Sequence, residues 1–374
     1  MKVEDIRTEE EFDALREEWN GLLVRSTSNN VFLTFDWMRT WWKHYKPDKR
    51  LFIVVVRDPS GRLLGIAPLC IKKETLYGLA SLRVLTFLGT EEVCSDYLDF
   101  ILDRGGKEEA FMVILDYIES HSGLWDYVLL SDIWESSWSF NRIKESLATR
   151  ARDYYLPEVK ECPYIALPDS FDAYIKRLSR NSRNNLMRKT RKLQKKYEAV
   201  FSECNVPDVE TAMEDLFELH KKRREMLRKE SDFITKRMMA FHMDISRTLH
   251  RKGIVRVYCM RINGVPASML YGFTYNKKFF YYQAGMDPQY EKLSVGMVLM
   301  GYCIKDCIEK GLVEFDFLRG REAYKYRWTD TWKTTASIAL PAGGLKGRSY
   351  LAAQTILRRA KSITKKGLSL PRDA

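Results

Sequence analysis

Two tight turns, about 200 residues apart, divide the sequence into halves in which the same elements are expected in the same order. Pro59-Ser60-Gly61 and Asn263-Gly264 each separate two apolar runs, which is the pattern of a β-hairpin. A repeat of this length indicates a duplicated domain rather than a solenoid. After each hairpin the pattern predicts a strand, a helix and a strand, at 97–102, 107–120 and 125–130 in the first half and at 279–284, 294–310 and 313–318 in the second.

The duplication predicts an α/β (α+β) fold with two tandem domains, and a length of 374 residues agrees with that number. We expect each domain to have a mixed, mostly antiparallel, twisted sheet flanked by helices. The expected boundaries are 1–168 for the first domain, 169–345 for the second and 346–374 for a basic C-terminal helix and tail. Residues 171–251 are predicted to form a mostly helical insertion between the two sheets.

Composition favours a cytoplasmic protein. The first residues, MKVEDIRTEEEF, are acidic and polar, unlike a signal peptide, and apolar runs such as 51–56 are too short to cross a bilayer. The cysteines number seven and are scattered, which favours reduced thiols over a disulfide framework. Cys303 and Cys307 are four residues apart, but no second cluster of ligands follows, so we expect core packing and no metal site.

The net charge of +12 favours an anionic partner, such as a phosphorylated cofactor, an anionic sugar, nucleic acid or a membrane surface. Residues 177–196 contain nine Lys or Arg and no acidic residue. Guanidinium groups bind phosphate and carboxylate oxygens in pairs, so this segment suits an anionic acceptor; a solvated helix face is the alternative. No aromatic residue lies between Tyr174 and Tyr197, which argues against stacking on single-stranded nucleic acid.

The helix of the second repeat begins with small residues, Ser294, Val295 and Gly296. The first N–H groups of a helix have no partner within it, and the helix dipole favours an anion at this end. A strand followed by such a helix start is a way to hold a phosphate, although an ordinary capped helix has the same spacing.

Several segments together resemble the CelD-like acetyltransferases, a branch of the GNAT superfamily close to the Fem-type peptidyltransferases. They cover nearly the whole chain in order. The segments are VFLTFDWMRTWW (31–42), GRLLGIAPL (61–69), SDYLDFIL (95–102), LSRNSRNNLMRKTRKL (178–193), ELHKKR (218–223), YYQAGMDPQYEKLSVG (281–296) and FDFLRGREAYKYRW (315–328).

The resemblance implies two tandem GNAT-like domains that transfer an acyl group from acetyl-CoA or another acyl-CoA to an amine. It implies an acceptor such as an amino sugar or a precursor of the cell envelope or of a polysaccharide. In such folds the pyrophosphate lies at the helix start, so the second half is expected to bind the coenzyme. The first half is expected to form a wall of the groove that binds the acceptor. The coenzyme-binding residues expected on this basis are Tyr282, Gln283, Ser294, Val295 and Gly296.

Five residues are candidates for the chemistry, two of them as alternatives for the same proton donor. His220 can take a proton from an ammonium nucleophile, with a histidine on a helix face as the alternative. Asp316 points away from its phenylalanine neighbours and is a second candidate base, or else a partner for Arg319, Arg321 or Arg327. By its position in the fold, Tyr324 or Tyr326 would protonate the leaving thiolate. Lys325 could hold a phosphate or the tetrahedral oxyanion.

Residues of both halves are expected to bind the acceptor. They are Thr34, Trp37, Asp96, Tyr97, Arg180, Arg183 and Arg327. Two other functions remain open at this point. One is a Fem-type aminoacyltransferase that uses aminoacyl-tRNA, and the other is a non-enzymatic module that binds nucleic acid or a membrane surface through 177–196 and 346–366. The basic tail could also provide peripheral membrane contact.

Overall fold

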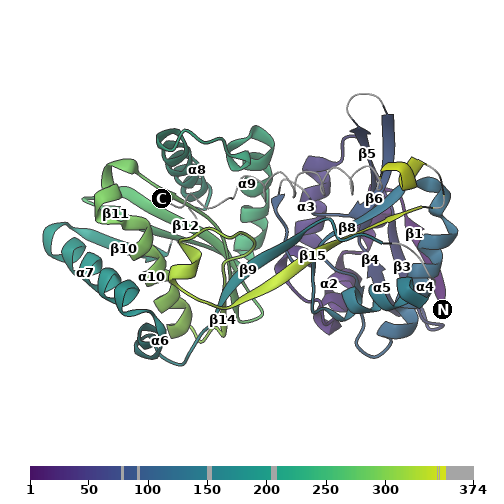
Figure 1. Ribbon diagram of the computed structural model, residues 1–374, viewed down its shortest axis with the longest axis horizontal. Helices are drawn as coiled ribbons and strands as arrows, with labels where there is room; N and C mark the ends of the chain where they lie inside the picture. Colours follow the sequence, from purple (N-terminus) through teal and green to yellow (C-terminus); the bar gives the residue numbers. More distant parts are fainter. Residues whose placement is uncertain are drawn as a thin grey trace, which may run out of the picture.

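Two α/β halves lie side by side in the computed structural model, and long strands run between them (Figure 1). The structure describes residues 1–76, 80–90, 93–149, 154–203, 209–342, 344 and 346–350. Most of the expected basic tail, residues 351–374, lies outside the described residues. In the described ranges, no helix is long and apolar enough to cross a bilayer.

The first half begins with a strand that the sequence pattern did not predict. This strand, β1, pairs with β3, and two short helices follow it. Thr8 starts the first helix through a capping box with Glu11. The elements are β1 (Lys2–Ile6), α1 (Glu9–Ala14), α2 (Arg16–Arg25), α3 (Phe35–Tyr45), β2 (Lys49–Leu51), β3 (Ile53–Arg57), β4 (Leu63–Ala67), β5 (Leu69–Leu76), β6 (Ala80–Phe87), β7 (Ile101–Leu102), α4 (Lys107–Ser120), β8 (Tyr127–Trp134) and α5 (Trp138–Thr149).

The second half repeats this order of strand, helices, hairpin, strand, helix and strand. Its elements are β9 (Val159–Ala166), α6 (Phe171–Arg177), α7 (Arg180–Lys196), β10 (Ala199–Glu203), α8 (Val209–Met226), α9 (Lys236–Arg251), β11 (Val255–Ile262), β12 (Val265–Tyr275), β13 (Lys278–Met286), α10 (Val295–Glu309), β14 (Glu314–Asp316) and β15 (Trp332–Pro341). Short 3-10 turns, η4 (Asp232–Ile234), η5 (Pro288–Leu293) and η6 (Lys325–Arg327), connect some of them.

The segment expected to be a mostly helical insertion also contains β10, which pairs antiparallel with β11. Helices α8 and α9 follow β10 just as α1 to α3 follow β1. Residues 199–251 are therefore the first part of the second repeat, and α6 and α7 are the additional elements. Alternating apolar residues are few in β10, because it is an edge strand of the sheet, so the pattern gave no signal there.

One sheet passes through both halves of the molecule (Figure 1). It has eleven strands in the order β10-β11-β12-β13-β14-β9-β15-β8-β6-β5-β2, and the first half has a second sheet, β1-β3-β4-β7. Strand β9 pairs with β14 at one end and with β15 at the other, while β15 also pairs with β8. The expected boundary at 168/169 thus separates chain segments that share a sheet.

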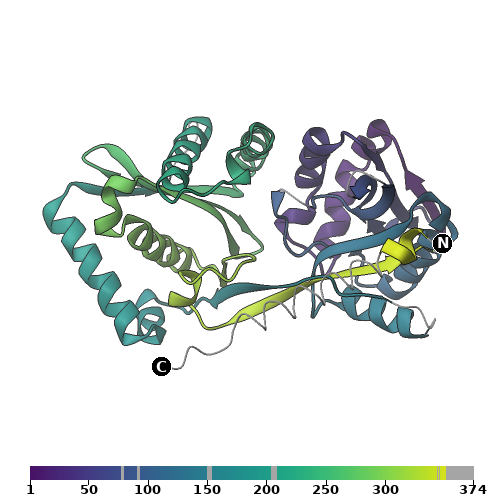
Figure 2. The ribbon, with the colours of Figure 1, turned by 45° about the horizontal axis from the view of Figure 1, so that its top comes forward.

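The two halves also share a hydrophobic core. Trp37 of α3 lies between the halves, with ring centroids 5.1 Å from Phe241 of α9 and 5.4 Å from Phe273 of β12. This core includes α8 and α9, which cover one face of β11 to β13, and α10 covers the other face with α6 and α7 (Figure 2). A common core and a common sheet hold the halves in one relative orientation.

Candidate active site

Strands β13 and β14 separate soon after they meet, and the site lies in the opening. Their parallel pairing covers three positions only, from Lys278 opposite Glu314 to Phe280 opposite Asp316. Beyond this point β13 continues to Met286 while β14 ends. The sheet therefore opens between the two strands on the side where α10 begins.

A β-bulge turns several residues of β13 toward the same side. Tyr271 pairs with Gln283 and the next residue, Gly272, pairs with Tyr281, so Tyr282 is the extra residue. A side chain on Gly272 would overlap the carbonyl oxygen of Phe280, so this position requires glycine. Tyr281, Tyr282 and Gln283 all line one cavity, which regular alternation along a strand would prevent.

Three neighbouring cavities follow from this opening. The central cavity, about 610 Å³, lies between the halves, and the α10 cavity, about 240 Å³, lies at the start of α10. The central cavity is lined by Cys94, Asp96, Arg224, Glu230, Ser231, Asp232, Phe233, Met238, Tyr281, Tyr282, Gln283, Phe317, Leu318, Arg319, Gly320, Glu322, Tyr324 and Lys325. The α10 cavity is lined by Arg223, Ser268, Met269, Leu270, Tyr281, Ala284, Met286, Glu291, Ser294, Gly296, Met297, Leu299, Met300, Tyr324, Arg327 and Trp328.

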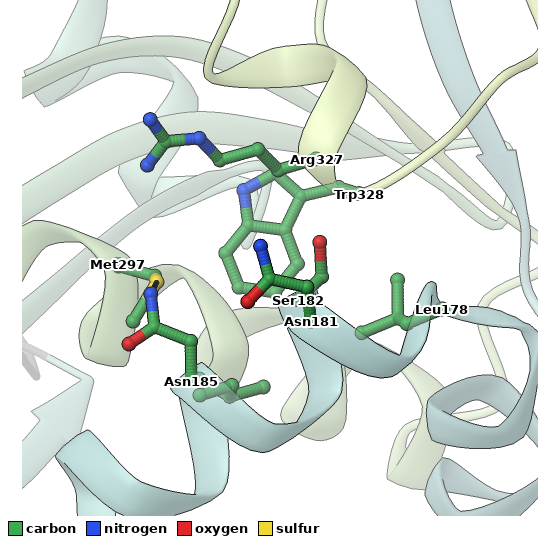
Figure 3. A pocket seen from close by; sticks show the side chains of 8 residues that line it. Leu178, Asn181, Ser182, Asn185, Met297, Arg327 and Trp328 are labelled. Carbon is green, nitrogen blue, oxygen red and sulfur yellow. Dashed lines mark hydrogen bonds between the residues drawn. The ribbon is translucent and has the colours of Figure 1, made fainter.

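The third, the α7 cavity, has a volume of about 240 Å³ and lies between α7 and the turn after β14. Figure 3 shows Asn181 and Asn185 of α7 on one side and Arg327 and Trp328 on the other. Its lining residues are Leu178, Asn181, Ser182, Asn185, Leu186, Met297, Arg327 and Trp328. Neighbouring cavities share lining residues, so the three lie next to one another along a path from α7 past α10 to the junction of the halves.

The α10 cavity has the features of an anion site. Ser294 has a left-handed backbone with φ of 58° and makes no side-chain capping bond, so the first N–H groups of α10 remain available. Ser294 and Gly296, two of the predicted coenzyme-binding residues, line the cavity, whereas the side chain of Val295 is buried in the core. Arg223 and Arg327 also line it, and neither guanidinium has a hydrogen bond or ion pair with any residue that the structure describes.

Tyr324 and Tyr281 lie where the central and α10 cavities meet. The Tyr324 hydroxyl donates to that of Tyr281 over 3.4 Å. Burial raises the pKa of both phenols, so both remain protonated at neutral pH. Tyr324 can therefore supply a proton to a group located between the two cavities. Tyr326, the other tyrosine expected at this position, bonds to Glu161 and lies outside the three linings.

His220 is held between β13 and the loop after α8. Its Nδ1 lies 3.1 Å from the carbonyl oxygen of Ala284, and its Nε2 lies 2.9 Å from the hydroxyl of Ser231. A carbonyl can only accept, so Nδ1 carries the proton and Nε2 accepts from Ser231. Burial lowers the pKa of His220, which keeps the ring neutral at pH 7. His220 lines none of the three cavities, whereas Ser231 lines the central one.

A close approach of α8 to β13 makes this arrangement possible. A Cβ on Gly285 would lie 2.8 Å from the backbone nitrogen of His220 and 2.8 Å from the Cβ of Leu219. Only glycine at this position lets the helix come near enough for the His220 ring to reach the carbonyl of Ala284.

Asp316 and Lys325 support the loop that forms one wall of the central cavity. Asp316 accepts hydrogen bonds from the hydroxyl of Tyr97 (2.7 Å) and from the N–H of Leu318 (2.8 Å). Lys325 donates to the carbonyls of Leu318 (3.2 Å) and Arg319 (2.6 Å). These contacts hold Leu318 at a φ of 55°, which is costly for a side chain of this size. Asp316 is fully buried, which raises its pKa to about 6, and it lines none of the three cavities.

A buried cluster of ion pairs joins the two halves at the wall of the central cavity. Arg319 contacts Asp96 (2.7 Å) and Asp132 (2.9 Å) of the first half, and Lys160 contacts Asp132 (2.9 Å). Nε of Arg319 and Oδ1 of Asp96 are close enough for an ion pair but are not aligned for a hydrogen bond. Asp96 lines the cavity, as expected for a residue near the acceptor, but its charge is matched by Arg319.

The other first-half residues that were predicted to bind the acceptor make contacts within the protein. Thr34 caps α3, and Trp37 donates its indole N–H to the hydroxyl of Ser95 in the shared core. The hydroxyl of Tyr97 donates a hydrogen bond to Asp316. None of these three residues lines one of the three cavities. Arg180 and Arg183, on the first turn of α7, also lie outside the linings.

Two predicted coenzyme residues on β13 face the central cavity. Tyr282 donates to the carbonyl of Val93 and lies 3.0 Å from Nε2 of His242. The side-chain oxygen of Gln283 accepts from the N–H of Ala284. Both therefore line the cavity while their polar atoms bond to the protein.

Most of the lining residues were not predicted as site residues, among them Arg223, Ser231, Tyr281 and Arg319. Arg223 lies three residues after His220 on one helix face, and this spacing could have indicated it. Ser231 lies in a loop, and no sequence pattern indicates its contact with His220. Among the described residues, no cluster of three or more His, Cys, Asp or Glu side chains is arranged to hold a metal ion.

Comparison with family models adds an independent observation. Residues 180–326 match the model described as an acetyltransferase (GNAT) domain. The match covers the elements from α7 to β14. It includes most of the residues that line the three cavities. This part of the chain is therefore similar to an acetyltransferase domain of the GNAT superfamily. No curated protein matches the chain in sequence.

Solved structures resemble the fold over its whole length. FemX is 12% identical, with a TM-score of 0.64 over 95% of this chain and 100% of FemX. L-PGS from Bacillus licheniformis is 10% identical, with a TM-score of 0.54 over 91% of this chain and 96% of L-PGS. A protein of unknown function from Bacteroides thetaiotaomicron is 11% identical, with a TM-score of 0.57 over 87% and 97%. At these identities the likeness establishes the fold alone.

Proposed function

We propose that the chain transfers an acyl group from an acyl-CoA thioester to a primary amine. The observation that carries the proposal is the α10 cavity. An uncapped helix start meets Arg223 and Arg327 at one end of it, and neither arginine has an ion pair among the described residues. Helix N–H groups and guanidinium groups are the ligands that a pyrophosphate requires. At the other end, Tyr281 and Tyr324 line both this cavity and the central cavity.

The proposed donor lies along this path. Its pyrophosphate is at Ser294 and Gly296, its pantetheine arm passes the opening between β13 and β14, and its thioester is near Tyr324. The backbone of β13 at the bulge is free of β14, so an N–H group there can polarise the thioester carbonyl. Lys325 does not contribute to this step in the proposal, because its ammonium group bonds the loop carbonyls.

The acceptor is proposed to lie in the central cavity. Glu230 and Asp232 line it, and their carboxylates have no hydrogen bond or ion pair within the described residues. Four acidic side chains line it, Asp96, Glu230, Asp232 and Glu322, against three basic ones, Arg224, Arg319 and Lys325. The excess charge of the lining is negative, which favours a cationic amine over the anionic acceptor expected from Arg180 and Arg183.

The proposed reaction is direct attack of the amine on the thioester. A C–N bond forms, the C–S bond breaks, and Tyr324 gives a proton to the leaving thiolate. His220 receives the proton that the ammonium group must lose before it attacks. An amino sugar or a polysaccharide precursor, as the CelD-like resemblance implies, carries an amine of the required kind.

The test is to measure binding and transfer in the same protein. Thermal unfolding should shift upward with acetyl-CoA and with CoA, and thiol release should require an added amine. Arg223→Ala combined with Arg327→Ala should weaken acetyl-CoA binding by about 10²- to 10⁴-fold, since each charge-assisted contact contributes about 1.5–3 kcal/mol. Arg50→Ala, an exposed residue of β2, is the matched control. A folded protein that binds no acyl-CoA would contradict the proposal.

A second candidate is aminoacyl transfer from aminoacyl-tRNA, which the Fem-type resemblance implies. The observation in its favour is that none of the nine basic residues of 177–196 forms an ion pair within the described part of the chain. A solvated basic helix is suited to the nucleic-acid backbone. If charged tRNA stabilises the protein, acetyl-CoA does not, and α7 charge reversal abolishes the effect, this candidate replaces the first.

A further inference from the structure

The hydroxyl of Ser231 connects the central cavity to a histidine that the cavity does not reach. We infer that Ser231 is a proton-relay residue: it takes a proton from the acceptor ammonium and passes its own to Nε2 of His220. This inference rests on the proposed acyl transfer and specifies how the buried histidine takes part. The juxtaposition that carries it is the 2.9 Å contact between Ser231 and His220 at the wall of the cavity.

His220 cannot contact an acceptor in the central cavity directly. Its side chain is buried, its Nδ1–H is used by the carbonyl of Ala284, and its Nε2 faces Ser231. The ring also packs against Phe233, with centroids 5.3 Å apart, which closes one of its faces. A base with this geometry exchanges protons with the cavity only through the group bonded to Nε2.

Ser231 is suited to this role by its neighbours. It is half-buried in the loop between α8 and η4, and the carboxylates of Glu230 and Asp232 on either side line the same cavity without a partner among the described residues. These charges attract an ammonium group to the loop. The Ser231 oxygen has two lone pairs, so it can accept from the ammonium while its own proton is donated to His220.

The tautomer of His220 sets the direction of transfer. The carbonyl of Ala284 requires a proton on Nδ1, so Nε2 is the free base that faces Ser231. When Nε2 gains a proton, the imidazolium still donates to Ala284, which helps to stabilise the charge.

The protons balance over the cycle. The ammonium loses one proton through Ser231 to His220, and the neutral amine forms the C–N bond. The tetrahedral adduct loses a second proton from nitrogen while Tyr324 protonates the leaving thiolate, so this proton restores the phenol directly or through water. After the products leave, the imidazolium returns its proton through Ser231 to water. No oxidant or further reactant is needed.

A panel of small amines tests the relay. Transfer from acetyl-CoA would be measured with n-butylamine, which is an ammonium ion at neutral pH, and with hydroxylamine, which is mostly neutral there. Ser231→Ala should lower kcat for n-butylamine by about 10²-fold and kcat for hydroxylamine much less, since general-base catalysis contributes about 10²–10⁴. The KM for acetyl-CoA and the thermal stability should not change.

Two further variants separate the relay from a structural role. Ser231→Thr keeps a hydroxyl and should retain most of the activity with n-butylamine. His220→Gln should lose as much as Ser231→Ala, and the double variant should lose no more than either, because the two act as one unit.

Three results would overturn the inference. An equal loss for both amines would make Ser231 a structural residue, and full activity in Ser231→Ala would remove it from the reaction. An increase in protein mass at Ser231 after incubation with acetyl-CoA alone would make it an acylated nucleophile. Failure of the wild-type protein to use any amine would instead refute the proposed function, and the relay with it.

Discussion

At the scale of single residues, burial raises the pKa of the carboxyl groups of Asp96, Asp99 and Asp316, whose neighbours differ. Asp316 and Asp96 each have a basic neighbour, Lys333 at 3.7 Å and Arg319 at 2.7 Å. Asp99 has only hydroxyl groups and a backbone N–H, from Ser28, Ser139, Ser137 and Phe100. Its burial raises its pKa to about 6, so the native protein binds this proton more tightly than the unfolded chain does.

This difference gives a prediction for stability against pH. The contribution of Asp99 is favourable below its unfolded pKa and is lost as pH rises toward 6, at a cost of roughly 3 kcal/mol from the shift. Asp99→Asn removes this titration. We therefore expect the free energy of unfolding of the variant, relative to wild type, to increase between about pH 4 and about pH 7 in urea titrations. A difference that is independent of pH would contradict the assignment.

The two tyrosines after β14 allow a matched comparison. Tyr324→Phe removes the hydroxyl at the junction of the cavities, so kcat for acyl transfer should fall by about 10²-fold while acetyl-CoA binding is retained. Tyr326→Phe is the control, because its hydroxyl bonds to Glu161 outside the linings. Steady-state kinetics and equilibrium binding measure the two effects separately. Equal losses in both variants would mean that neither phenol is the acid.

Part of the site could be predicted at this scale because it depends on local sequence. Ser294 and Gly296 were expected from the start of a helix, and Tyr324 and Arg327 from a family segment; all four line the α10 cavity. Asp316 and Lys325 were expected to take part in catalysis. Their hydrogen bonds to Tyr97 and to the loop at Leu318 depend on the other half of the molecule and on one backbone angle, which a sequence pattern does not contain.

At the scale of elements, local signals placed most helices and hairpins. The expected helix at 107–120 has the predicted bounds. The pattern missed β1 and β10, because the pairing of an edge strand is with distant residues and few of its side chains are buried. The close approach of α8 to β13 is also a contact between distant residues, so the sequence pattern did not predict it.

This approach gives a prediction for Gly285. Gly285→Ala would place a methyl group 2.8 Å from the backbone of α8, and we expect a loss of about 1–3 kcal/mol in stability as the helix moves away. The displacement lengthens the contact of His220 with Ala284, so kcat should also fall. Gly123→Ala is the control, since a Cβ there meets no atom within 4 Å. Chemical denaturation and kinetics check both effects. An unchanged kcat would show that the position of α8 does not affect the reaction.

At the scale of the whole molecule, the shared sheet and shared core predict one cooperative unit. Strand β15 pairs with β8 of the first half, and Trp37 packs on residues of α9 and β12. We expect both halves to unfold in one transition, because neither retains a complete core without the other. Calorimetry and two spectroscopic probes should give the same midpoint. Two separate transitions would show that the halves are independent domains, as the boundary at 168/169 had suggested.

The return of β15 to the first half has a consequence for the order of events during synthesis. Strand β8 emerges from the ribosome some 200 residues before its partner, and the sheet edge it offers stays open during that interval. An open edge is a site for unwanted pairing between chains. The first half is therefore translated first but completed last, and a slow or interrupted synthesis of the second half exposes the first to aggregation.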